Sequence, residues 1–332
     1  MPTRKELIEA IENSRQSRLI CYFTGDRKDQ ETQIGDDALP ILAQHLGIIG
    51  KVSALDVLIY SRGGNTLTGF AMANAMREFA DKVNVLVPFR AHSAATLIAL
   101  SADSIVAGPF AQLSPIDPSV NTPHGPSIKH GGEKKFLPVS VEDVANYFEL
   151  ARTEAGLKEE QHLATVFGYL SQRVSPLALG TVYRAREQIG MLATKLLSLH
   201  SNDEARIAKV VKLLTRQLLS HDYYIGRREA KAMDLDVVDA TSDEADLMWK
   251  LYEDVADELK LAEPWNWESE AQGNLPKAVK VPRCVLESRD LKHIYSTTYQ
   301  LKRIQVPGGP GGGGKKGETL QITPLDDSWK KV

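Results

Sequence analysis

The stretch ALDVLIYSRGGNTLTGFAMANAMREFADKVNVLVPF, residues 54–89, decides the fold class of this chain. Residues 54–61 form a nearly continuous apolar run, which is typical of a strand buried on both faces of a sheet. Residues 65–80 have helical periodicity, with Asn65 or Thr66 as the expected N-cap, and residues 82–89 form a second strand. Two strands joined by a helix predict parallel neighbours with a right-handed crossover.

The flanking segments extend this pattern in both directions. Residues 18–25 are a strand candidate, a helix begins at about Asp36, and residues 93–103 form another helical segment. A short strand then leads into a proline-bounded turn within residues 104–117. We therefore expect an α/β fold over residues 18–120, with a parallel sheet flanked by helices.

The second half of the chain is mostly helical in pattern. Residues 120–138 are polar and rich in glycine and proline, which predicts a long surface loop. Helices are predicted over residues 140–156, 158–172, 176–200, 203–220 and 242–261, with a last short strand within 231–241. The tail has strand-like runs at 281–306 and 318–325 on either side of a glycine tract. The expected parts are an N-terminal helix (1–17), an α/β domain (18–241), a helical extension (242–280) and a β-rich C-terminal arm with the glycine tract (281–332).

The composition narrows the class of protein and its location. The 332 residues have a formal net charge of -3, which gives no electrostatic support for a nucleic-acid partner. Cys21 and Cys284 are far apart without CxxC spacing, so the sequence predicts neither a disulfide framework nor a cysteine-built zinc site. No apolar run approaches the roughly 20 residues that span a bilayer. The N-terminus has no apolar core of a secretory signal. We expect a cytoplasmic protein without metal or cofactor.

Ser93 is the first candidate for chemistry. It follows the strand at 82–89 and opens the helix at 93–103, within RAHSAATLIAL (90–100). A serine at such a position projects its hydroxyl beside the first N–H groups of the helix, where an oxyanion would be stabilised. Serine is also a preferred helix cap, so position alone leaves nucleophile and cap as alternatives.

Gly63 and Gly64 supply a second signal. They end the buried strand at 54–61, and glycines there allow backbone N–H groups to turn toward a ligand. A strand that ends in two glycines also occurs at many ordinary tight turns. Neither GxGxxG nor GxxxxGK[ST] is present, which argues against a dinucleotide site and a P-loop.

Together, DVLIYSRGGNTLTGFAMANAMREF (56–79) and VPFRAHSAATLIALSADSIVAGPFAQLSPIDP (87–118) resemble the Clp/crotonase-fold serine peptidases. The sequence of these segments is most similar to that of the serine dehydrogenase proteinase family, whose members are relatives of signal peptide peptidase A. HDYYIGRREAKAMDLDVVDA (221–240) is similar to the closing unit of that family. The resemblance implies that Ser93 is the nucleophile. It also implies an oxyanion hole formed by the N–H of Gly63 or Gly64 together with that of Ala94.

At the positions expected to supply the general base, this sequence differs from its better-known relatives. Asp117 stands where the Clp-type peptidases have a histidine, and Asp222 matches their aspartate, with His221 directly before it. The resulting hypothesis is a rearranged triad in which His221 is the base and Asp117 or Asp222 orients its ring. Asp117 is the preferred partner because adjacent residues seldom pair their side chains. Lys134 or Lys135 is the alternative base of a Ser–Lys pair.

These residues and the resemblance predict a cytosolic serine endopeptidase that cleaves unfolded or flexible polypeptide through an acyl-enzyme. The alternatives are a crotonase-like acyl or thioester enzyme without proteolysis, and a catalytically dead oligomeric scaffold. The resemblance also implies a homo-oligomer, as a dimer or a ring. The C-terminal arm is a candidate for assembly or for contact with a protein partner.

Overall fold

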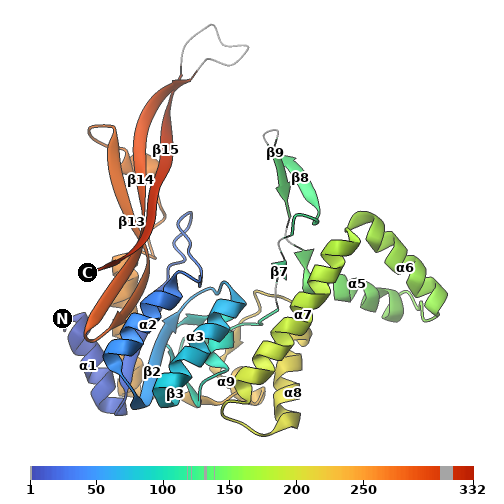
Figure 1. Cartoon of the computed structure of the whole chain (residues 1–332), viewed down its shortest axis with the longest axis horizontal. Helices are drawn as coiled ribbons and strands as arrows, with labels where there is room; N and C mark the ends of the chain where they lie inside the picture. The colour runs from blue at the N-terminus through green and yellow to red at the C-terminus, as the bar shows by residue number, and fades with distance from the viewer. Residues whose placement is uncertain (1, 118, 121, 131–132, 138, 307–316) are drawn as a thin grey trace. The chain divides into compact units, whose positions relative to one another are not determined.

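The computed structural model describes residues 2–332 except 118, 121, 131–132, 138 and 307–316. The chain divides into two compact units (Figure 1). The first unit combines residues 1–112 with 236–332, and the second contains residues 113–235. These are units of packing, and the domain boundaries expected from the sequence stay a prediction.

An eight-stranded sheet organises the first unit, in the order β12-β5-β3-β2-β1-β13-β14-β15. The first five strands in this order are parallel, and the last three add to β1 in antiparallel fashion. The predicted fold class, α/β with a parallel sheet flanked by helices, is confirmed. The strands are β1 (Arg18–Thr24), β2 (Val52–Tyr60), β3 (Ala80–Val87), β5 (Ser104–Ala107), β12 (Val237–Asp239), β13 (Lys277–Ser288), β14 (Leu291–Val306) and β15 (Gly317–Lys331).

Helices cover both faces of this sheet because its parallel strands are apolar on both sides. Along β1, Leu19, Cys21 and Phe23 belong to the core that includes residues of α1 and α10. The alternate residues Ile20 and Tyr22 lie against side chains of α2 and α3, which cover the other face (Figure 1). The helices of this unit are α1 (Arg4–Arg15), α2 (Ala38–Ile49), α3 (Thr66–Phe79), α4 (Ala94–Ala99), α10 (Ser242–Leu259) and α11 (Trp267–Glu270).

The tail is part of the main sheet. Residues 281–306 were expected to be β-rich, and β13 and β14 occupy this region; β13 pairs with β1 from Ile20 opposite Ser288 to Thr24 opposite Cys284. The expected return strand at 318–325 is the longer β15, paired with β14. The glycine tract at 307–316 lies outside the described residues.

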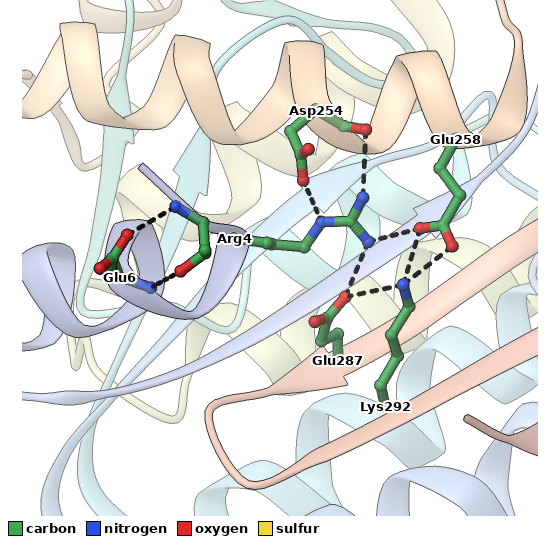
Figure 2. A network of polar contacts seen from close by, with 7 residues as sticks. Arg4, Glu6, Asp254, Glu258, Glu287 and Lys292 are labelled. Carbon is green, nitrogen blue, oxygen red and sulfur yellow. Dashed lines mark hydrogen bonds and ion pairs between the residues drawn. The ribbon is translucent and has the colours of Figure 1, made fainter. Parts of the chain in front are cut away.

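A polar network fastens α1 to this sheet (Figure 2). Arg4 reaches from α1 to Asp254 and Glu258 of α10 and to Glu287 of β13. Lys292 of β14 donates to Glu258, with 2.8 Å between Nζ and Oε1. The network joins segments from the two ends of the sequence within one unit.

The second unit contains four longer helices, α5 (Val141–Thr153), α6 (Glu160–Arg173), α7 (Pro176–Leu197) and α8 (Glu204–Lys212), as the periodicity predicts. A π-helical turn (Leu213–Gln217), β11 (Ile225–Gly226) and α9 (Arg227–Ala232) follow. The expected loop at 120–138 contains strands: β7 (Ser119–Val120) pairs with β10 (Val139–Ser140), and β8 (Ser127–His130) pairs with β9 (Glu133–Phe136). Main-chain pairing does not require apolar side chains, so the polar composition gave no sign of it. β6 (Gln112–Leu113) lies at the boundary of the two units along the chain.

Candidate active site

Ser93 lies where the chain turns from the sheet into a helix. β3 ends at Val87, the two-residue strand β4 (Arg90–Ala91) follows, and α4 begins directly after Ser93. Ser93 has φ 52° and ψ -115°, a backbone conformation that residues other than glycine rarely adopt. Such strain costs about 1–3 kcal/mol and is found most often at functional sites.

The strained turn separates the two interpretations of this serine. A capping serine accepts a hydrogen bond from an N–H in the first turn of its helix. Ser93 occupies the N-cap position, but its side chain accepts no such bond from the N–H groups of α4, all of which the structure describes. Its side chain is half-buried, while Ala94 and Ala95 behind it are fully buried. The geometry therefore matches a hydroxyl held for chemistry better than a helix cap.

Gly63 and Gly64 form a second turn, which lies directly against the turn at Ser93. Their φ values are 105° and 149°, both in the region that favours glycine. A Cβ atom on Gly63 would lie 2.6 Å from Cβ of Ser93 and 3.0 Å from its Oγ. A Cβ on Gly64 would lie 2.5 Å from the backbone N and O atoms of Ile34. Only glycine at both positions lets the chain pass between Ser93 and Ile34.

The N–H groups of this turn differ in what they can donate to. The Gly63 N–H donates to Oγ of Ser61 at 2.9 Å, and its carbonyl accepts from the Ile34 N–H at 2.9 Å. Within the described part of the chain, the N–H groups of Gly64 and Ala94 have no acceptor. Of the two glycines considered for an oxyanion hole, Gly64 is therefore the one whose N–H is available as a donor, and the Ala94 N–H is available as well.

Buried hydroxyls support the glycine turn, and their role could not be predicted from the sequence. Thr24, the last residue of β1, donates to Oγ of Ser61 at 2.7 Å, and both residues are fully buried. Ser61 in turn holds the Gly63 N–H. The two hydroxyls are 37 residues apart in sequence, so only the pairing of β1 with β2 brings them together.

His221 and Asp117 form a pair within the second unit. Nδ1 of His221 lies 3.1 Å from Oδ1 of Asp117, and Asp117 is 7% exposed. The hydrogen bond to Asp117 raises the pKa of His221 above its ordinary value. Asp222 is exposed and acts on His221 through its charge alone, as a smaller cause of the same pKa shift. Of the two carboxylates considered as orienting partners, Asp117 is the one that holds the ring.

A cavity of about 260 Å³ within the second unit borders this pair. Its walls include Asp117, His221, Glu142 and residues of the π-helical turn at Leu213–Gln217. Burial raises the pKa of Glu142 although Nε of Arg186 lies 3.3 Å from its carboxylate. A π-helical turn is a common feature of functional sites. The cavity therefore has a polar wall beside a histidine whose pKa is raised by its hydrogen bond to Asp117.

The structure gives no side-chain positions for the two lysines predicted as alternative bases. Lys134 and Lys135, the alternative bases, belong to β9, and their side chains lie outside the described part of the structure.

Among the residues that the structure describes, no three His, Cys, Asp or Glu side chains gather as they would around a metal ion. No helix in the described ranges is both long enough and apolar enough to cross a membrane.

Acyl transfer by a serine requires its hydroxyl beside backbone N–H donors, and this arrangement brings Ser93 and the glycine turn together at the carboxyl edge of the parallel sheet. Residues 1–146 match the family of ClpP-like SDH-type serine proteinases. Over that part of the chain, this match supports the similarity to the family that the sequence predicts. It includes Ser93, the glycine pair, Ala94 and Asp117, whereas His221 and Asp222 lie beyond it.

Two curated relatives come from Methanocaldococcus jannaschii, and both are named only as uncharacterized proteins. One is 26% identical over 260 residues, which cover 75% of this chain and 78% of the relative. The other is 29% identical over 148 residues, which cover 42% of this chain and half of the relative. They show that the similarity of this chain to other proteins extends beyond residue 146, and their names carry no activity.

Proposed function

We propose that this chain is a serine endopeptidase in which Ser93 attacks the peptide carbonyl. The family match supports a peptidase-type function. The observation that carries the assignment of Ser93 is its strained backbone against Gly63, with an added Cβ on Gly63 only 3.0 Å from the Ser93 oxygen. Strain of this kind persists only where the surrounding structure holds it in place.

The proposed reaction uses groups with matched roles. The Ser93 oxygen bonds to the carbonyl carbon while His221 accepts the hydroxyl proton. The N–H groups of Gly64 and Ala94 donate to the oxyanion, and Asp117 orients and stabilises the charged imidazole. His221 then returns the proton to the leaving amine, and water hydrolyses the acyl-enzyme on Ser93 by the same steps.

The proposed substrate is unfolded or flexible polypeptide in the cytoplasm, bound as an added strand beside Ser61–Asn65. Main-chain pairing of this kind gives little selectivity for sequence. The two free cysteines, both buried, fit a reducing compartment. We also propose that the chain assembles with copies of itself, as a dimer or a ring, because Clp-like proteases commonly do.

A fluorophosphonate probe tests the assignment because it reacts covalently with activated serines. We expect the native protein to be labelled at Ser93, and Ser93→Ala to lose labelling completely. Ser104→Ala is the matched control, since Ser104 is also half-buried and donates to Asn84 at the opposite edge of the sheet. His221→Gln should lower the labelling rate by roughly 10⁶-fold.

Two outcomes would contradict parts of this proposal. A native protein that stays unlabelled would favour the non-proteolytic acyl-transfer enzyme or the inactive scaffold. Labelling that depends on Ser93 but not on His221 would instead reject the histidine as the base and leave a lysine to be sought.

A further inference from the structure

Asp26 is a nearly buried carboxylate that accepts hydrogen bonds from three donors on two separate segments of the chain. Its side chain is 8% exposed. Oδ1 accepts from the Tyr60 hydroxyl at 2.7 Å. Oδ2 accepts from Nε of Arg62 at 3.0 Å and from Nη1 of Arg90 at 2.7 Å. Three charge-assisted bonds to one carboxylate are strong and directional, and they fix the donors relative to one another.

The donors occupy positions that matter for the candidate site. Tyr60 is the last residue of β2, and Arg62 directly precedes Gly63. Arg90 begins β4, three residues before Ser93. Asp26 itself lies two residues beyond the end of β1. One carboxylate therefore connects the chain ahead of the glycine turn to the chain ahead of the strained serine.

Backbone pairing forms a second connection between the same two loops. The Ser61 N–H donates to the carbonyl of Arg90 at 3.0 Å, and the His92 N–H donates to the carbonyl of Ser61 at 2.9 Å. These two bonds make an isolated parallel bridge between Ser61 and Ala91. The residues that donate to Asp26 are direct neighbours of this bridge in sequence. Tyr60 and Arg62 flank Ser61, and Arg90 precedes Ala91, so the carboxylate supports both segments of a bridge that has only two bonds.

The carboxylate is costly to replace because one of its partners is buried and another is half-buried. Tyr60 is 1% exposed, and burial followed by the charge of Asp26 raises its pKa, so the hydroxyl stays a donor. The Arg90 guanidinium lies over the Phe89 ring, 4.5 Å from its centroid, and its side chain is 27% exposed. Without the negative charge, the half-buried Arg90 guanidinium would lose its counter-charge, and the buried Tyr60 hydroxyl would donate to a neutral amide oxygen in place of a carboxylate.

We propose that Asp26 is a positioning residue that sets the glycine turn and the Ser93 turn at their working separation. The catalytic part of this inference rests on the proposed peptidase function. The structural part does not, because it concerns only the two loops and the bridge between them.

Asp26→Asn tests the structural part by hydrogen exchange. The amide keeps the size of the side chain and removes its charge. The Ser61 and His92 amides, which form the bridge, should exchange faster than in the native protein. Asp103→Asn is the matched control: Asp103 binds Nη1 of Arg77 at 2.7 Å and the Val83 N–H at 2.8 Å, at the opposite, amino-terminal edge of the same sheet. It should leave both amides unchanged.

The fluorophosphonate labelling rate tests the catalytic part. We expect Asp26→Asn to lower the labelling rate and kcat by about tenfold to a hundredfold with little change in KM, as a small misplacement of reacting groups does. Arg62→Met removes one donor from a side chain that is 60% exposed, so it should fold and show a smaller loss. Asp103→Asn should label at the native rate.

The outcomes separate the two proposals. Unchanged exchange at Ser61 and His92 in Asp26→Asn would overturn the positioning role, whatever the labelling shows. Native-rate labelling of Asp26→Asn, in a native protein that labels at Ser93, would overturn it as well. If the native protein fails to label, the peptidase proposal falls, and faster exchange in Asp26→Asn would still support the link between the loops.

Discussion

At the scale of single residues, Gly63 and Ser93 constrain each other. Gly63→Ala would place a Cβ 2.6 Å from Cβ of Ser93 at a φ of 105°, and both the contact and the backbone conformation oppose it. We expect the labelling rate at Ser93 to fall by about a hundredfold and the free energy of unfolding to fall by about 1–3 kcal/mol. Labelling kinetics and urea unfolding measure the two effects.

The control for this substitution is Gly47→Ala. Gly47 lies inside α2, and a Cβ there would meet nothing within 4 Å. Alanine should stabilise the helix by about 0.5–1 kcal/mol and leave labelling unchanged. If Gly63→Ala labels as fast as Gly47→Ala, the hydroxyl does not depend on this turn.

The His221–Asp117 pair predicts how activity depends on pH. His221 must be neutral to accept a proton, and Asp117 raises its pKa. The rate should therefore rise with pH around a midpoint above the ordinary histidine value of about 6.5. Asp117→Asn should move this midpoint to lower pH and cut the maximal rate by roughly 10⁴-fold. A pH profile of kcat/KM measures both changes.

Asp222→Asn is the matched control for the pH profile. Asp222 raises the pKa of His221 by charge without a hydrogen bond, so its removal should shift the midpoint less than Asp117→Asn does. An unchanged midpoint in Asp117→Asn would reject His221 as the titrating base.

The stability of the fold should depend on pH in the opposite direction to the activity. A raised folded pKa means that the stabilisation from charged His221 is fully present just below the unfolded histidine pKa of about 6.5 and is lost as pH rises through the folded pKa.

At the scale of elements, local patterns predict what is local. The apolar runs of β1, β2 and β3 and the helical period of α3 were sufficient for the parallel sheet, because burial on both faces leaves a continuous apolar signature. The tail also showed strand character. Its partner could not be predicted, because alternation in β13 does not tell whether it adds to β1, and the two strands lie more than 250 residues apart.

In the candidate site, too, residues marked by a local sequence pattern could be predicted, and residues joined only by the arrangement of the strands could not. Ser93 and the glycine pair stand out because each sits where a strand ends, within a few residues of a recognisable turn. Asp26 lies in the polar stretch TGDRKDQ (24–30), and nothing nearby distinguishes it from Asp29. Its partners at 60, 62 and 90 come together only through the order of β1, β2 and β3 in the sheet.

At the scale of the whole molecule, the first unit depends on contacts between the two ends of the sequence. Arg4 is 12% exposed and bonds to α10 and β13, and Lys292 is the other cation beside Glu258 and Glu287 (Figure 2). Burial raises the pKa of Glu287 even with Arg4 present, so this carboxylate is costly to leave unpaired. Arg4→Met should keep the packing of the side-chain stem and remove its charge.

We expect Arg4→Met to lower the free energy of unfolding by about 2 kcal/mol, between the values for exposed and fully buried ion pairs. Urea unfolding followed by tryptophan fluorescence measures it. Lys250→Met is the control, since Lys250 and Asp246 form an exposed pair on α10 with side chains 51% and 60% exposed. That change should cost about 0.5 kcal/mol or less. Equal losses in the two variants would mean that α1 is held by its apolar face alone, through Leu7, Ile8 and Ile11 in the core it shares with α10.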